Sequence, residues 1–420
     1  MYIDLYLDSS PVSDLPENIA DEIIRRNLVA SRDKAKVSFC GMLNMHGAIS
    51  IFLPRSIDHK GILGEEKITV ASSLLKAVEI YGRQSKTAVH ISDEGEGRSG
   101  ITRLSLIRQL LLGYRQNGLY ARRRVVSQIN AGKPDWRATV TAGGAFPARD
   151  GRPIYLNIKG SKRRYFSDCE VARIHAYVLR TLDDTYSWIF TGKEGLMAPE
   201  LKDVPSPVGA NLVMRAVLKS ELRLVYSDNE IALIKALIEY LELEAGDEEG
   251  STVSGLKSFH YAWEHMLYQV LANKYPINNV LPAPSYKKTL GGYEDAFASA
   301  MKTDISLKHP ENDTVAIVDA KYYAARNVST APGWPDLMKQ FFYEKAFSLI
   351  EPDYEVRNAF IFPGEEGPLE SAHLKSREDG GLFDDDFSPI ACYYVKPLDV
   401  IEHFVQNRKM QDLTNILLGC

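Results

Sequence analysis

Two short segments near residue 310 contain the residue types that could do chemistry on a phosphodiester. Asp304 stands before a turn, and a second carboxylate, Asp319, closes an apolar run with Lys321 two positions further on. Two carboxylates can hold a divalent cation such as Mg²⁺, or Mn²⁺ in its place, through oxygen ligands. A lysine beside them can orient and help to deprotonate a water, or stabilise developing negative charge. We interpret Asp304, Asp319 and Lys321 as a nuclease centre, with the two aspartates as metal ligands.

Strand geometry predicts how these residues come together. Alternation of side chains in residues 315–322 puts Asp319 and Lys321 on the same face of a strand. The polar segment 308–313 contains a proline, so we expect a loop there that joins two strands. A hairpin-like pair of strands would then bring Asp304 beside Asp319.

The acid-x-lysine triplet is common by itself. It also occurs at the triplets that begin with Asp58, Glu65 and Glu200. Asp319 differs by its context, because ionised groups at the end of an apolar strand are costly to bury unless they are paired or bind an ion. The context favours the catalytic interpretation over a chance match.

Two predicted helices contribute one further polar residue each. A helix over 256–273 has an apolar face with Glu264 beside it, and a second helix starts at the prolines of 332–335 and includes Gln340. Glu264 could reach the edge of the site, and Gln340 could position a water or a phosphate. The alternative is that both are surface polar residues of their helices.

Composition places the chain among ordinary globular proteins. It has 420 residues, 45% of them apolar and 25% charged, with a net charge of −5, which allows two or three domains. No apolar run is long enough to cross a bilayer, and the N-terminal residues lack the order of a secretion signal. We therefore expect a cytoplasmic protein without membrane contact. The four cysteines have no paired spacing, so neither disulfides nor a zinc site are predicted.

The residue pattern divides the chain into three sections. Residues 1–165 mix short apolar runs with turns and one helix over 102–114, which indicates an α+β region. Residues 166–245 have helical periodicity. The acidic segment 246–251 is a predicted break, and 246–420 forms the domain that contains the candidate site.

Basic residues gather at two places in the first section. Such clusters are more often solvated surface than binding sites, and the sequence does not decide between a contact with DNA and a contact with a partner. The candidate contact residues are Arg122, Arg123, Arg124, Lys162, Arg163 and Arg164.

A dinucleotide-binding fingerprint also occurs, at Gly95–Gly100. Asp93, Glu94 and Glu96 place negative charge where a pyrophosphate would lie, and arginines stand where an acidic residue should follow about twenty positions later. We interpret this segment as a flexible loop before a helix, which could touch a partner protein.

These motifs together resemble a known nuclease family. Their order is similar to the PD-(D/E)xK core of McrC and of the related LlaJI-type restriction subunits, with Thr303 where the motif name prescribes proline. The segments that match, from about residue 115 to 365, are Gly132–Val140, Gly151–Leu156, Trp263–Glu264, Thr303–Ile305, Val318–Tyr322 and Asp336–Gln340.

The resemblance implies that the α+β N-terminal region, residues 1–165, binds a partner and could contact DNA, and that it is followed by an α/β restriction-endonuclease-like domain with a mixed central sheet flanked by helices. It also implies a Mg²⁺-dependent endonuclease subunit that cuts double-stranded DNA in a phage-defence restriction system, together with a McrB-like AAA+ NTPase. The sequence itself lacks a phosphate-binding loop of the Gly-x-x-x-x-Gly-Lys-Ser/Thr type. A stand-alone nuclease in repair or another defence system, and a non-enzymatic adaptor of such a motor, remain as alternatives.

Overall fold

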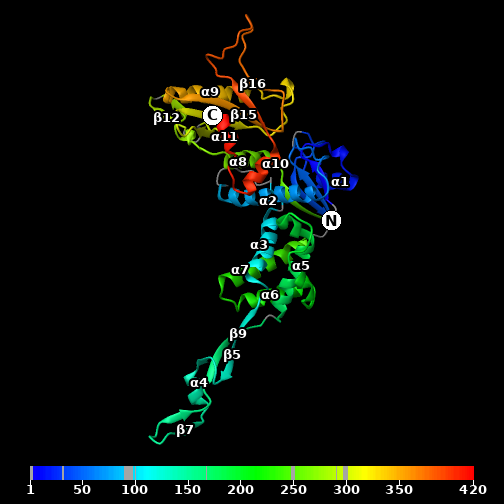
Figure 1. Ribbon diagram of the computed structural model, residues 1–420, viewed down its shortest axis with the longest axis vertical. Coiled ribbons are helices and arrows are strands. Elements are labelled where there is room, and N and C mark those ends of the chain that lie inside the picture. Colours follow the sequence, from blue (N-terminus) through cyan, green and yellow to red (C-terminus); the bar gives the residue numbers. More distant parts are fainter. Residues whose placement is uncertain are drawn as a thin grey trace. The chain divides into compact units, whose positions relative to one another are not determined.

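The computed structural model describes residues 3–30, 33–88, 98–99, 101–166, 168–246, 251–289, 291–296 and 301–420. The chain forms two compact units (Figure 1). The first comprises residues 1–105, 188–194 and 250–420, and the second comprises 106–187 and 195–249. This division differs from the three predicted sections, because most of the first section and nearly all of the last belong to one unit. The division of function at residues 165 and 245 stays a prediction.

The first unit contains a five-stranded sheet to which both ends of the unit contribute. The strand order is β1 (Ile3–Leu7), β3 (Ala48–Leu53), β2 (Cys40–Met45), β10 (Ser251–Leu256) and β4 (Arg98–Ser99). Of the segment Gly95–Gly100, only Arg98 and Ser99 of β4 lie within the described part of the chain. The helices α1 (Glu17–Arg25) and α2 (Glu65–Ala88) belong to the same unit.

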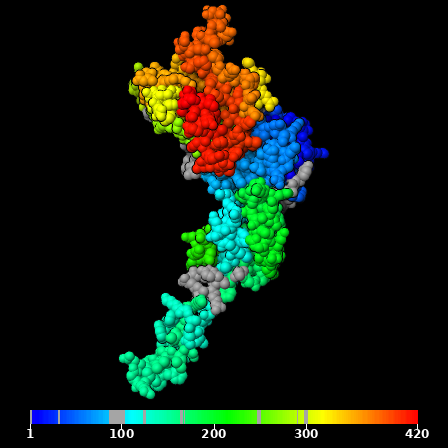
Figure 2. Space-filling model, in the orientation of Figure 1, coloured from blue at the N-terminus to red at the C-terminus, as the bar shows by residue number. Residues whose placement is uncertain are grey.

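The pairing of β10 with β2 joins the candidate nuclease section to the N-terminal section. In this antiparallel pair Gly41 lies opposite Gly255. A Cβ added at Gly41 would lie 2.4 Å from the carbonyl oxygen of Ser254, so only glycine allows the two backbones to approach so closely. Figure 2 shows the N-terminal and C-terminal residues of this unit in one continuous surface, and α2 packs against α10 (Pro397–Val405).

A second five-stranded sheet in the first unit is mixed, as expected. Its order is β13 (Ile305–Lys308), β14 (Thr314–Ala320), β15 (Glu355–Pro363), β17 (Ile390–Val395) and β16 (Ser371–Ala372). The hairpin prediction is confirmed, because β13 pairs antiparallel with β14, with Ile305 opposite Val318. The next two strands run parallel to β14.

Helices pack against this sheet and set the positions of the site residues. Val315 and Ile317 of β14 form a core with Tyr343 and Phe347 of the helix α9 (Trp334–Ile350). The predicted start of α9 is confirmed, with Gly333 as its N-cap residue and proline in its first turn. The helices α8 (His260–Val270) and α11 (Gln411–Leu418) also contact the sheet. The helix predicted over 256–273 is shorter than expected at both ends, because Leu256 belongs to β10 and the backbone is already extended at Leu271.

The second unit contains the predicted helical section and a group of short strands. Its helices are most of α3 (Ile101–Asn117) and α5 (Glu170–Thr191), together with α6 (Asn211–Leu222) and α7 (Asp228–Gly246). The predicted apolar stripe of α5 is buried at Val171, Ile174, His175, Val178 and Leu182. β5 (Arg122–Ile129) and β9 (Lys159–Phe166) form a long ribbon, with α4 (Trp136–Thr141) and β7 (Ala145–Pro147) nearby in Figure 1.

The remaining short strands are β6 (Lys133–Pro134), β8 (Pro153–Tyr155), β11 (Ser285–Lys287) and β12 (Tyr293–Asp295). β8 pairs with β7, and β11 pairs with β12. Within the described ranges, no helix has both the length and the apolar composition required to cross a membrane.

Candidate active site

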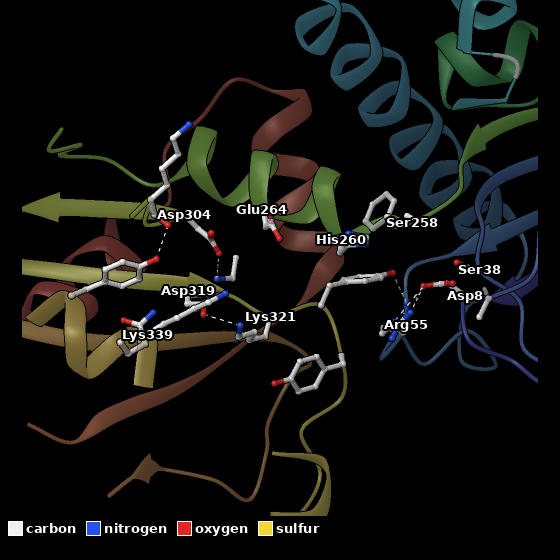
Figure 3. Close-up of a pocket in the computed structure, with 18 residues that line it drawn as sticks. Asp8, Ser38, Arg55, Ser258, His260, Glu264, Asp304, Asp319, Lys321 and Lys339 are labelled. Carbon is white, nitrogen blue, oxygen red and sulfur yellow. Dashed lines mark hydrogen bonds and ion pairs between the residues drawn. The ribbon is translucent and has the colours of Figure 1, made fainter. Parts of the chain in front are cut away.

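All five residues predicted to carry catalysis line one cavity of about 720 Å³ in the first unit. Figure 3 shows Glu264, Asp304, Asp319 and Lys321 directed toward a common space, with Asp8 and Arg55 at the other end of the cavity. The cavity is lined by β14 of the second sheet, by α8 and α9, and by residues that adjoin the strands of the first sheet. The side chains that contribute include Glu264, Asp304, Asp319, Lys321 and Gln340.

Lys321 is held between two carboxylates. Its Nζ lies 2.8 Å from Asp319 Oδ2 and 2.7 Å from Asp336 Oδ1. Burial alone would lower the pKa of Lys321, but the two ion pairs outweigh it and raise this pKa above its ordinary value. Lys321 therefore stays protonated at neutral pH, which favours a role in charge stabilisation or orientation over a role as a base.

Asp304 is positioned by the start of β13. Its Oδ2 accepts a hydrogen bond of 3.2 Å from the backbone N–H of Ala320, and the preceding Thr303 is fixed by Asn278, whose Oδ1 accepts the Thr303 N–H at 2.8 Å. Loss of hydration within the cavity, then the charge of Asp319, raise the pKa of Asp304 to about 7.

Glu264 reaches the cavity from α8. The helix buries Trp263, Met266 and Leu267 on its apolar face, so the intervening Glu264 is held at the edge of this face. Burial and the charge of Asp319 raise the pKa of Glu264 to about 7, and Lys321 opposes this shift. The surface alternative for Glu264 does not describe its position, because the side chain is half-buried and lines the cavity.

Gln340 lies on α9 and is 1% exposed. Its Oε1 is buried without a hydrogen-bond partner among the described residues. A buried amide oxygen without a donor costs free energy, and a water or a metal-bound ligand in the cavity would remove this cost. Here too the surface alternative does not describe the position of the residue.

The donor set fits a hard divalent cation that keeps part of its water shell. Among the residues that the structure describes, no three His, Cys, Asp or Glu side chains form a group that could hold a metal ion by themselves. Mg²⁺, however, is usually bound by one or two carboxylates together with waters and substrate phosphates. Asp304 and Asp319 supply two carboxylates, and Gln340, whose Oε1 has no partner among the described residues, lines the same cavity.

The N-terminal section contributes to the cavity in a way that the sequence patterns missed. Asp8 and Arg55 line it and form an ion pair of 2.7 Å. The Arg55 guanidinium lies 4.4 Å from the ring centroid of Tyr322, and the backbone N–H of Arg55 donates to the Tyr322 hydroxyl at 3.2 Å. The residue next to Lys321 is therefore anchored on the N-terminal sheet. Only the apolar surroundings of Tyr322 in the sequence could have suggested its burial.

The two basic clusters lie outside this cavity, on β5 and β9 of the second unit. These strands pair antiparallel, with Arg124 opposite Arg164 and Val126 opposite Lys162. Lys162 is exposed, whereas Arg122 Nε donates to the buried carboxylate of Glu221 at 2.8 Å, which gives Arg122 a structural role. The side chains of Arg123, Arg124, Arg163 and Arg164 are outside the described part of the structure, and their contacts with DNA or a partner stay a prediction.

Fold and cavity together define a mixed α/β protein with several sheets and a carboxylate–lysine centre. A protein-family model described as LlaJI restriction endonuclease matches residues 39–370, and the chain belongs to this family. It is similar to the type II restriction enzyme BsuMI component YdjA of Bacillus subtilis (strain 168). The two are 24% identical over 205 residues, and this match covers 46% of this chain and 43% of that relative. The chain thus matches less than half the length of this relative.

A solved structure is also similar. It is a chain of the half-complex from the tetradecameric assembly of Thermococcus gammatolerans McrB AAA+ hexamers with bound McrC. The two chains have a TM-score of 0.43 and 13% sequence identity, over 99% of this chain and 100% of the other. We draw no conclusion from so distant a similarity.

Proposed function

We propose that the protein is a Mg²⁺-dependent endonuclease subunit that hydrolyses phosphodiester bonds of double-stranded DNA in a restriction system, with a nuclease centre of the PD-(D/E)xK type. One observation carries the proposal. Glu264, Asp304, Asp319 and Lys321, which belong to three separate motifs, line one cavity, with Lys321 ion-paired to Asp319. Membership of the LlaJI restriction endonuclease family supports it.

Each side chain has a distinct task in this proposal. Asp304 and Asp319 hold the divalent cation, which supplies Lewis-acid stabilisation of the phosphate and a water of lowered pKa. Lys321, kept protonated by Asp319 and Asp336, stabilises the negative charge that develops on the phosphate oxygens. Glu264 can accept or release a proton near neutral pH, and Gln340 positions a water through its unpartnered Oε1.

The proposal includes a partner with NTPase activity. The resemblance to McrC-type and LlaJI-type subunits implies a McrB-like AAA+ protein, and this chain has no phosphate-binding loop of its own. The segment 122–166 supplies a surface for such a partner, because several of its large apolar side chains are exposed and such patches mark protein interfaces. These side chains are Ile129, Trp136, Val140, Phe146, Ile154 and Leu156.

Cleavage of DNA by the purified chain, with and without an AAA+ NTPase encoded beside it, tests the proposal. We expect cleavage that requires Mg²⁺, is removed by EDTA and is lost in Lys321→Ala. Lys287→Ala, an exposed lysine of β11, is the matched control and should cut like the wild type. Cleavage that persists in Lys321→Ala would exclude this centre.

The partner arm of the test uses nucleotide dependence. If DNA is cut only when the NTPase and its nucleotide are present, the two-subunit proposal holds. Tight cutting at a defined site by the chain alone, without nucleotide, would instead favour a stand-alone nuclease. No Mg²⁺-dependent cleavage in either setting would favour the adaptor.

A further inference from the structure

A second, smaller cavity adjoins the nuclease cavity. Its volume is about 270 Å³, and Asp8 and Arg55 line both cavities, so that this ion pair forms their common wall. The rest of the smaller cavity is lined by Leu7, three serines, Ala324 and Arg326. Figure 3 shows the Asp8–Arg55 pair at the far end of the nuclease cavity from Asp304.

The smaller cavity has an excess of positive charge. Its single acid, Asp8, is already paired with Arg55. That pair engages Nε and Nη2 of Arg55, and since a guanidinium has five N–H groups, donors remain for another anion. Arg326 is exposed, and no ion pair of its guanidinium is found among the described residues. Two arginines therefore line this cavity, and its single acid is paired with only one of them.

Ser56 gives an independent indication of a ligand. Its Oγ is buried and has no hydrogen-bond partner among the described residues, although it lines the cavity. Ser56 and Ser9 both have positive φ angles, of 67° and 72°. Such backbone strain in residues other than glycine is concentrated at functional sites, where it directs groups toward a ligand. The hydroxyl lacks the partner that a phosphate oxygen would provide.

A third cavity, on the other side of Ser56 and Arg326, limits how far an anionic strand could extend. It has a volume of about 330 Å³ and shares Ser56 and Arg326 with the smaller cavity, but Asp58, Glu365 and Glu366 also line it. Like charge would repel a phosphate there. The chemistry therefore favours one phosphate between Arg55 and Arg326 rather than a long track.

We propose that Arg55, Arg326 and Ser56 form a subsite for one backbone phosphate of the DNA strand that is cut, at the opposite end of the nuclease cavity from the scissile phosphate bound at Asp304 and Asp319. This inference rests on the proposed nuclease function. Arginine is suited to the task because its planar donors match phosphate oxygens. The subsite would fix the position of the strand along the cavity and so place one phosphodiester at the catalytic centre.

A scan of neutral phosphates combined with an arginine variant tests the subsite. Duplexes that carry a single methylphosphonate at successive positions beside the cut are cleaved by the wild type, by Arg326→Ala and by Arg377→Ala. Arg377 is exposed and lines none of the three cavities, so it controls for the loss of one positive charge. Arg55 is left intact because its removal would leave Asp8 buried without a partner.

For the wild type we expect one flanking position at which the methylphosphonate raises KM about tenfold with little change in kcat, as the loss of one charge-assisted contact predicts. In Arg326→Ala, KM should be raised already and that position should lose its effect. The slope of log affinity against log salt should fall by about 0.9. Arg377→Ala should keep the wild-type pattern.

Two outcomes separate the subsite from the proposed function. If the wild type cuts DNA but Arg326→Ala and Arg377→Ala give the same KM and the same methylphosphonate pattern, the subsite is wrong and the nuclease stands. If the wild type cuts nothing, the subsite is tested by DNA binding instead. Binding of the same duplexes to each variant is measured in EDTA by fluorescence anisotropy. The subsite then requires that Arg326→Ala, and not Arg377→Ala, weakens binding and cancels the effect of one methylphosphonate.

Discussion

Glu22 and the carboxylates of the nuclease cavity, all in the first compact unit, have opposite electrostatic surroundings. At Glu22 of α1, Arg25 Nη2 lies 2.7 Å from Oε1, and Ser251 Oγ donates to the same oxygen at 2.6 Å. Arg26 also pairs with Glu22. Burial opposes the ionisation of Glu22, but these bonds outweigh it and lower its pKa to about 2. The result is a charge network closed on itself that ties α1 to β10.

In the nuclease cavity the balance is reversed. Burial and neighbouring acids raise the pKa values of Glu264 and Asp304, each to about 7, although Lys321 lies close to Asp319. Carboxylates that are compensated within the chain stabilise the fold, whereas carboxylates short of positive charge are ready to bind a cation or a proton. The comparison therefore teaches that the balance of charge around an acid distinguishes a structural carboxylate from a candidate catalytic one.

Asp319→Ala should have the largest effect. It removes one of two proposed metal ligands, and we expect cleavage to fall by about 10³-fold or more, since several kcal/mol of transition-state stabilisation are lost. The secondary structure measured by circular dichroism should be unchanged. Asp353→Ala, an exposed aspartate, is the control and should cut normally. Full activity in Asp319→Ala would end the distinction between the two clusters.

Glu22→Gln should lower stability without changing cleavage, the converse of Asp319→Ala. The change removes the counter-ion of Arg25 and Arg26, both of which solvent reaches, and takes a charged acceptor from the buried Ser251 hydroxyl, so we expect the free energy of opening β2 and β10 to fall by about 2 kcal/mol. Hydrogen exchange of amides in these strands measures it. Cleavage per folded molecule should not change. Asp21→Asn, an exposed neighbour on α1, removes the same charge and should leave exchange unaltered.

Acid titration of stability gives an effect of similar size with a defined pH window. The folded pKa of Glu22, about 2, lies below the ordinary value of 4.5, so its contribution is present above pH 4.5 and is lost as the pH falls toward 2. Because solvent reaches Arg25 and Arg26, we expect a loss of about 2 kcal/mol. The difference in stability between wild type and Glu22→Gln should narrow over this window. A difference that stays constant down to pH 2 would contradict the assignment.

Local sequence patterns predicted much of the candidate site but little of its frame. The hairpin that joins Asp304 to Asp319 and the helix that holds Gln340 follow from alternation, a proline loop and a proline helix start, all of which act within about twenty residues. The pairing of β10 with β2 depends on contacts across more than two hundred residues. No short pattern encodes such a contact, and the predicted separation of the first and last sections did not anticipate it.

The same limit explains which residues the sequence missed. Asp8 and Arg55 have no motif around them, and they reach the cavity only because the N-terminal sheet packs against Tyr322. Glu22 and its arginines are likewise an ordinary charged helix end until Ser251 is brought beside them. Family resemblance could supply the order of motifs. It could not supply the electrostatic balance around each acid, which depends on distances and burial.

Asp304→Asn should have the smallest effect on stability and the opposite sign to that of Glu22→Gln. The folded pKa of Asp304, about 7, lies above its ordinary value of 3.8, so ionisation of Asp304 destabilises the fold progressively between pH 3.8 and 7 and fully above pH 7. Asparagine removes this repulsion and can still accept the Ala320 N–H. In EDTA, we expect the thermal midpoint of Asp304→Asn to exceed that of the wild type at pH 8 and to match it near pH 4, while cleavage in Mg²⁺ is lost. Asp353→Asn should shift neither quantity. A lower midpoint for Asp304→Asn at pH 8 would mean that Asp304 is compensated like Glu22, and the contrast between the two clusters would not hold.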